Sequence, residues 1–163
     1  ADDVAEGLED GELSAEDAAW LARRCWGSPG LAERFGEEDL PDFNADLLDA
    51  LSDLDVSRNF ALSDWLQEEA DARADSRSEQ RLVLQQLLEC VVIVYRDLAV
   101  LAATGDPDKL FNPSIAEQDV GETDVEALLE RAEAALTAIE HVDSNVNEQL
   151  ALDHLFTRLA AGR

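Results

Sequence analysis

The stretch LLECVVIVYRDLAVL, residues 87–101, carries the strongest structural signal in this chain. Apolar side chains fill almost every position of it, and the run that starts at Cys90 is interrupted only by Arg96-Asp97. A helix that is hydrophobic nearly all round is buried on several sides. The charged pair also keeps the run far shorter than a membrane span. We therefore predict a long, buried helix over residues 79–104, at the centre of a helical bundle.

Helical spacing of apolar residues continues on both sides of this segment, and no strand pattern is evident. The other predicted helices span about 14–26, 29–36, 41–54, 57–72, 125–142 and 148–159. Asp55 or Ser57 is the expected cap of the helix that ends near Ala72. Residues 71–78 are either a connection or an exposed helical turn. Residues 107–121 are expected to form a longer connection with short helical turns, held by Leu110, Phe111 and Ile115.

The last two predicted helices meet at a polar break, DSNVN, residues 143–147. Asparagine is a preferred helix N-cap, so Asn145 or Asn147 is expected to cap a helix that begins near Glu148. An acidic residue in the first turn also suits the helix dipole. In the helix before the break, which follows Asp124, the apolar residues recur at spacings of three and four: Val125, Leu128, Leu129, Ala132, Ala135, Leu136 and Ile139.

Composition bounds the kind of protein this is. The chain has 163 residues, of which 38 are acidic and 12 basic, and its formal net charge is −26. Lys109 is the single lysine. The acidic side chains of such a surface repel one another at low salt, and this repulsion is screened at high salt. The composition therefore indicates a salt-loving source. It also disfavours direct contact with nucleic-acid phosphates, which lysine and arginine bind. An acidic disordered region is the competing interpretation, and the apolar periodicity argues against it.

Cysteine usage and the ends of the chain suggest a cytoplasmic fragment. Cys25 and Cys90 are far apart among apolar neighbours, without the spacing of a redox or metal motif, so both are expected to be buried thiols. No signal peptide or membrane-spanning segment is evident in the sequence. Because the chain lacks an initiator methionine, we expect it to be part of a longer protein.

Two phrases resemble a known family. Tyr95-Arg96-Asp97-Leu98 is followed later in the chain by Asn145-Val146-Asn147-Glu148-Gln149-Leu150-Ala151-Leu152-Asp153. Together they resemble the C-terminal domain of the delta-prime subunits of the bacterial DNA polymerase III clamp loader. Glu148 stands where that family often has Pro, and Asp153 stands where Glu is common. Both exchanges are mild, and Pro and Glu both suit a first helical turn.

The beginning of the chain resembles the end of the small helical lid of AAA+ loader subunits. The resemblance lies in the segment Leu21-Ala22-Arg23-Arg24-Cys25-Trp26, which is followed by the turn Gly27-Ser28-Pro29-Gly30. Residue 31 is Leu, so no nucleotide contact is carried over from ATP-binding relatives. The resemblance implies a lid remnant over residues 1–36 and a collar domain, an all-α helical bundle, over residues 37–163.

The resemblance also implies a role in assembly rather than catalysis. Such collar domains join loader subunits into the ring that places the sliding clamp on primed DNA, and the parent protein would be a subunit of the DNA polymerase III holoenzyme. The expected partners are the gamma/tau and delta subunits, with no cofactor, metal or direct DNA contact. Two alternatives stay open: the collar of a gamma/tau subunit, and a free-standing helical adaptor between proteins.

Few side chains point to chemistry. Arg96-Asp97 is expected to tether a neighbouring helix or subunit, to form an internal ion pair, or to support the Asn-Val-Asn break, and an internal role is favoured because a lone buried charge is costly. With Tyr95, Asn145, Asn147 and Gln149, this pair makes up the expected structural motif. His141 and His154 lack the paired spacing of a zinc site. We predict no catalytic residue.

Overall fold

The computed structural model describes residues 40–121, 123–144 and 147–161. Within these ranges the fold is an all-α bundle without a strand, which confirms the predicted fold class. Its helices are α4 (Leu40–Ser52), α5 (Asn59–Ala72), α6 (Arg77–Thr104), α7 (Val125–Asp143) and α8 (Glu148–Ala161). The turn Gly27-Ser28-Pro29-Gly30, the rest of the expected lid remnant and Cys25 lie outside the described residues.

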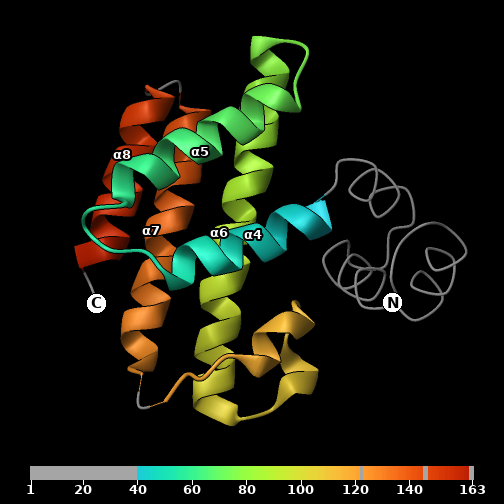
Figure 1. The fold of residues 1–163 in the computed structure, drawn as a ribbon, viewed down its shortest axis with the longest axis vertical. Coiled ribbons are helices and arrows are strands. Elements are labelled where there is room, and N and C mark those ends of the chain that lie inside the picture. The colour runs from blue at the N-terminus through green and yellow to red at the C-terminus, as the bar shows by residue number, and fades with distance from the viewer. Residues whose placement is uncertain (1–39, 122, 145–146, 162–163) are drawn as a thin grey trace, which may run out of the picture.

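The long helices α6 and α7 run antiparallel and share the most extensive contact in the bundle. Helix α8 returns beside α7, while α4 and α5 cross in front of the α6–α7 pair (Figure 1). Helix α5 also packs on α8, where Asn59 Nδ2 donates a hydrogen bond of 2.8 Å to the Thr157 hydroxyl. None of the described helices is long and apolar enough to cross a membrane.

Helix α6 supplies the centre of the core, as its sequence predicts. Leu84, Leu87 and Leu88 have no exposed surface, and neither do Val91 and Val94 in the following turns. The other helices add fully buried side chains to the same cluster, among them Leu47, Leu66, Leu152 and Phe156. Because these positions follow helical spacing on each element, the apolar stripes converge on one core.

The ends of α6 are set by two local devices. Ser76 is the N-cap, and its hydroxyl accepts a hydrogen bond of 3.3 Å from the Glu79 N–H. The helix therefore begins at Arg77, slightly before the predicted start at Glu79. At the other end Gly105 has φ +63°, the left-handed conformation that favours glycine and terminates helices. The predicted end of the helix is confirmed.

The predicted connection between α6 and α7 contains two short 3-10 helices, Pro107–Lys109 and Pro113–Glu117. Leu110 and Ile115 are buried and Phe111 is half-buried, as expected. Asn112 precedes the second of these helices, and its side-chain oxygen accepts a hydrogen bond of 3.1 Å from the Ser114 N–H.

One sequence prediction, the cap of α5, is wrong. Neither Asp55 nor Ser57 caps α5; Arg58 holds the cap position without a side-chain hydrogen bond. The Asp55 carboxylate instead accepts hydrogen bonds from the Ser57 N–H and hydroxyl, which folds the preceding turn. In α7, Leu129 and Leu136 are 47% and 49% exposed, so the buried stripe of this helix is narrower than its apolar stripe.

Candidate functional site

The Arg96-Asp97 pair of α6 anchors the connection between α6 and α7. Asp97 has no exposed surface, and its carboxylate forms an ion pair with the partly exposed Arg96 guanidinium. The second oxygen, Oδ2, accepts a hydrogen bond of 2.7 Å from the Asn112 N–H. Arg96 also donates to the Lys109 carbonyl oxygen at 2.9 Å. Both members of the pair therefore hold the backbone of the same connection against α6.

Aromatic side chains complete this anchor. The Arg96 guanidinium lies over the Phe111 ring, 4.4 Å from its centroid, within the range of a cation–π contact. Tyr95 is buried beside it in the sequence, and the Arg131 guanidinium of α7 lies 5.8 Å from the centroid of the Tyr95 ring. The Tyr95-Arg96-Asp97 phrase thus contacts both the connection and the helix that follows it.

Burial raises the pKa of the Asp97 carboxyl above its ordinary value of 3.8. The hydrogen bond from the Asn112 N–H and the ion pair with Arg96 act in the opposite direction, because they favour the charged form. Loss of hydration is the larger of the two influences. The anchor is therefore a carboxylate whose lost hydration is only partly replaced by protein partners, and it has no exposed edge for a substrate.

The second phrase begins α8. Asn147 Oδ1 accepts a hydrogen bond of 3.0 Å from the Leu150 N–H, so Asn147 is the residue that caps this helix. Gln149 Nε2 donates to Asp64 of α5 at 3.0 Å and to Asp153 at 3.1 Å. Asn145, with Val146, lies outside the described residues. The phrase thus starts the last helix and ties it to α5.

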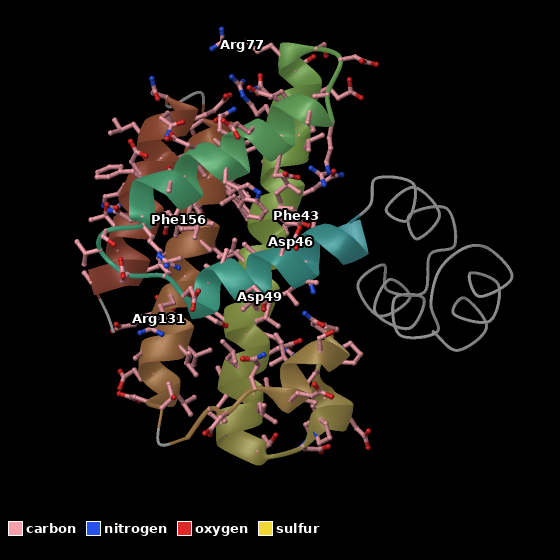
Figure 2. All side chains as sticks on the ribbon, in the orientation of Figure 1. Phe43, Asp46, Asp49, Arg77, Arg131 and Phe156 are labelled. Carbon is pink, nitrogen blue, oxygen red and sulfur yellow. The ribbon has the colours of Figure 1, made fainter. Side chains whose placement is uncertain are left out.

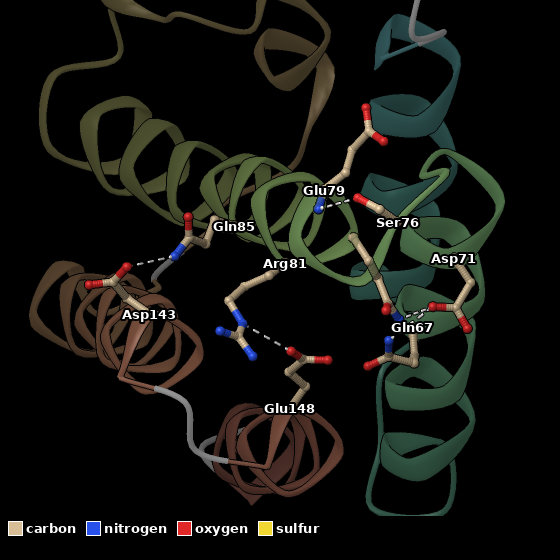
Figure 3. Close-up of polar contacts among 9 residues, drawn as sticks. Gln67, Asp71, Ser76, Glu79, Arg81, Gln85, Asp143 and Glu148 are labelled. Atoms are coloured by element: carbon tan, nitrogen blue, oxygen red, sulfur yellow. Dashed lines mark hydrogen bonds and ion pairs between the residues drawn. The ribbon is translucent and has the colours of Figure 1, made fainter.

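A polar cluster surrounds this helix start (Figure 3). Arg81 Nε of α6 lies 3.2 Å from Glu148 Oε1, and both side chains are mostly buried. Gln85 of α6 donates to Asp143 at the end of α7 over 3.4 Å. Glu148, which stands where the resembling family often has Pro, therefore forms an ion pair that joins α6 to α8.

The structure does not bring the two phrases together. The Asp97 anchor lies at the C-terminal half of α6, next to the 109–112 connection, whereas Asn147 and Glu148 lie near the N-terminal end of α6. Among the described residues, the Asp97 side chain contacts the connection and Arg96, and no contact links it to Asn147. Of the three roles considered for the pair, this geometry corresponds to the internal ion pair.

The histidines lie close to one another. His141 of α7 and His154 of α8 line a small hollow with Thr137 and Arg158. Within the part of the chain that the structure describes, no group of three or more His, Cys, Asp or Glu side chains could hold a metal ion. Cys90 is buried in α6, with its Sγ 3.6 Å from the Gln86 carbonyl oxygen.

One feature was not anticipated from the sequence: a hollow of about 540 Å³ between α4 and α5. Its lining includes Asp46 and Asp49, which Figure 2 shows on α4, together with Leu54 and Trp65. The sequence signal was the spacing of acidic residues along α4, and acidic residues are too common in this chain for that spacing to stand out.

Comparisons of the chain with known protein families, with curated proteins and with solved structures found no match. The resemblance to clamp-loader subunits therefore rests on the two phrases and the lid turn of the sequence.

Proposed function

We propose that this chain is the collar part of a delta-prime-like subunit of a bacterial clamp loader, acting in the cytoplasm of a salt-loving cell. In this role it helps to assemble the complex that places the sliding clamp on primed DNA. Its partners are the gamma/tau and delta subunits, which it binds through helix faces. It has no catalytic activity of its own and makes no direct contact with DNA.

The resembling phrases support this proposal because both take part in building the bundle. Asp97 holds the α6–α7 connection, and Asn147 and Gln149 fix the start of α8. Residues that shape a domain are the ones that would be shared among proteins with the same collar. An all-α bundle is also what a collar requires.

An apolar face on α7 is the observation that carries an assembly role. Leu129 and Leu136 are separated by two turns, so they lie on one side of the helix, and about half of each side chain is exposed. Val125 and Ile139 continue the same side and are partly buried. Exposed leucines aligned on one helix face, on a surface this acidic, suit contact with another protein.

The test is binding of the 163-residue chain to the purified gamma/tau and delta subunits of the same organism. Size-exclusion chromatography with light scattering is run from roughly 0.1 M to 3 M KCl, because screening of the acidic surface is expected to govern association. We expect a complex at high salt. The double variant Leu129→Asp/Leu136→Asp is expected to weaken it at least about tenfold.

The matched control is Leu150→Asp, because Leu150 is also exposed, at 62%, but lies on α8. This variant is expected to bind normally, and circular dichroism checks that each variant keeps its helix content. If no association occurs at any salt concentration, the loader proposal fails and the free-standing adaptor becomes the better hypothesis. A degenerate AAA+ domain encoded upstream would favour the loader; an unrelated upstream sequence would favour the adaptor.

A further inference from the structure

The hollow between α4 and α5 has an apolar floor built from one stripe of each helix. Ala50 and Leu54 come from the α4 side, and Ala61, Leu62 and Trp65 come from α5. The three α5 residues are spaced so that they share one helix face. Leu54 and Leu62 are buried, whereas Trp65 is only partly buried and lines the hollow. With a volume of about 540 Å³, the space is large enough for several side chains of a partner.

The rim of the hollow is negatively charged. Asp46, Asp49 and Asp53 follow one another along the α4 side with helical spacing, and Arg58 is the one basic residue in the lining. Arg58 already forms an ion pair with Asp53, with 3.1 Å between Arg58 Nη1 and Asp53 Oδ2. Asp46 and Asp49 are exposed, and their carboxylates have no partner among the described residues. Within the described ranges, the rim therefore presents two carboxylates without a partner beside an apolar floor.

An arginine guanidinium already lies over an aromatic ring next to the hollow. Phe43 stacks on Trp65 with ring centroids 5.2 Å apart and an angle of 6° between the planes. The guanidinium of Arg73 lies over the Phe43 ring, 5.5 Å from its centroid. Arg73, Phe43 and Trp65 are thus in successive contact, and Trp65 lines the hollow.

We propose that this hollow, the α4–α5 groove, docks a segment of a partner protein that carries arginine next to a leucine-sized apolar residue. The apolar side chain fills the floor, and the arginine pairs with Asp46 and Asp49 and stacks against Trp65. Arginine fits better than lysine because its planar group can pair with carboxylates and stack on an indole at once. This proposal does not depend on which assembly the chain belongs to.

Other occupants fit the groove less well. A second copy of this chain carries a net charge of −26 and would meet the acidic rim with charge of the same sign. Nucleic acid is disfavoured because its phosphates would lie against Asp46 and Asp49. A basic segment is attracted by the charge of the rim and buries apolar surface on the floor. The burial of apolar surface continues to favour binding when salt screens the charge attraction.

The probe is a fluorescein-labelled, alanine-based helical peptide of about 16 residues, a length at which a helix becomes marginally stable. Leucine and arginine alternate along one of its faces at spacings of three and four residues. Two matched peptides carry lysine or glutamate in place of arginine. Binding to the 163-residue chain is followed by fluorescence anisotropy. We expect the arginine peptide to bind most tightly, the lysine peptide several-fold more weakly, and the glutamate peptide not at all.

Variants of the protein locate the binding. Asp46→Asn/Asp49→Asn keeps the shape of the rim and removes its free charge, and it is expected to weaken the arginine peptide about tenfold. Glu130→Gln/Glu133→Gln is the matched control, because it removes the same charge from two exposed α7 positions with the same spacing. It is expected to leave affinity within about twofold. Trp65→Leu is expected to abolish the preference for arginine over lysine.

Two results would overturn the proposal. If both double variants weaken binding equally, the peptide responds only to net charge and the groove is not its site. If none of the peptides binds even at low salt, the groove does not accept a basic segment. Circular dichroism of each variant shows that the fold is intact, and the Asn variant decides the matter if Trp65→Leu fails to fold. Loss of clamp-loader association would leave both readouts unchanged, so the two proposals fail independently.

Discussion

Asp97 has no exposed surface although it carries a carboxylate in the most apolar helix of the chain. A buried charge is tolerated only when protein groups replace its hydration. Here the Asn112 N–H and the Arg96 guanidinium do so, and the same contacts hold the connection that leads into α7. A polar residue in the core therefore fixes the path of a segment that has little regular structure of its own.

Removing this carboxylate should destabilise the whole bundle. We expect Asp97→Ala to lower the free energy of unfolding by about 3 kcal/mol, because it leaves the buried Asn112 N–H without its acceptor and Arg96 without its ion-pair partner. Urea unfolding at neutral pH measures the loss. Asp108→Ala is the control, since Asp108 lies exposed in the same connection and should change stability by less than about 0.5 kcal/mol. Similar losses for both variants would contradict a specific role for Asp97.

The raised pKa of Asp97 gives the anchor a pH dependence of definite sign. Because its pKa is higher in the folded chain than in the unfolded chain, the folded state takes up the proton first as pH falls. The stability of the native protein relative to Asp97→Ala should therefore increase from neutral pH downward and level off below the ordinary value of 3.8. Urea unfolding of both proteins across this range checks it. A difference that shrinks with acidification would mean that the charged form is the preferred one.

At the scale of elements, each helix end is decided by a few atoms. The start of α8 combines the Asn147 cap with the ion pair between Arg81 and Glu148. The end of α6 depends on Gly105, whose left-handed backbone conformation would be strained for any residue with a side chain. This strain would come from the backbone angle alone, because no atom lies within 4 Å of the place where a Cβ would be. These devices determine where the chain turns, and the apolar stripes determine what it turns toward.

The cap of α8 can be tested by itself. Asn147→Ala should lower the free energy of unfolding by about 1 kcal/mol, because the Leu150 N–H loses its side-chain acceptor. Asn147→Ser should retain most of that stability, since serine is an equally good cap. Thermal unfolding followed by circular dichroism compares the two. If serine and alanine are equally damaging, Asn147 contributes through something other than the cap.

The elements were predictable where a residue acts on its own neighbourhood. Gly105 marks the end of α6, and Asp124 marks the start of α7, where its carboxylate accepts a hydrogen bond from the Glu126 N–H. The all-round apolar pattern of residues 87–101 allows only a central helix. The cap of α5 was mispredicted because Asp55 and Ser57 satisfy each other within the turn. Periodicity reveals an apolar face but not how much of it a neighbouring helix covers, so the exposure of Leu129 could not be foreseen.

The candidate sites were less predictable than the elements. The contact between Asp97 and Asn112 depends on the route of a connection without periodic signal, and no local rule gives that route. The α4–α5 groove depends on the angle at which two helices cross, which follows from packing over the entire core. Asp46 and Asp49 become candidate binding residues only because this crossing places an apolar floor beside them.

At the scale of the whole molecule, charge is the dominant property. A net charge of −26 on 163 residues opposes compaction through self-repulsion, whereas one apolar core built from all the described helices favours it. Few basic side chains are present to compensate, and the ion pairs among the described residues are mostly between neighbours in sequence or partly exposed. The balance should therefore depend on the ions in solution.

The melting temperature should rise with salt. We expect an increase between roughly 0.1 M and 3 M KCl, steepest at the low end, because screening of surface charge is most sensitive there. Thermal unfolding followed by circular dichroism measures it. Glu130→Gln/Glu133→Gln removes two acidic neighbours from α7 and should melt higher than the native chain at low salt, with the gap closing at high salt. A melting temperature that falls as KCl is added would show that attraction between charges outweighs repulsion.

The hydrogen bond between Asn59 and Thr157 joins residues 98 positions apart. A ribosome completes α5 long before α8 exists, because chain growth proceeds at about 5–20 residues per second. During that interval the side of α5 that will meet α8 has no partner, and chaperones that recognise apolar surface can bind it. A nonsense codon just ahead of α8 would accordingly leave this side of α5 uncovered, although the truncation begins more than 70 residues further along the chain.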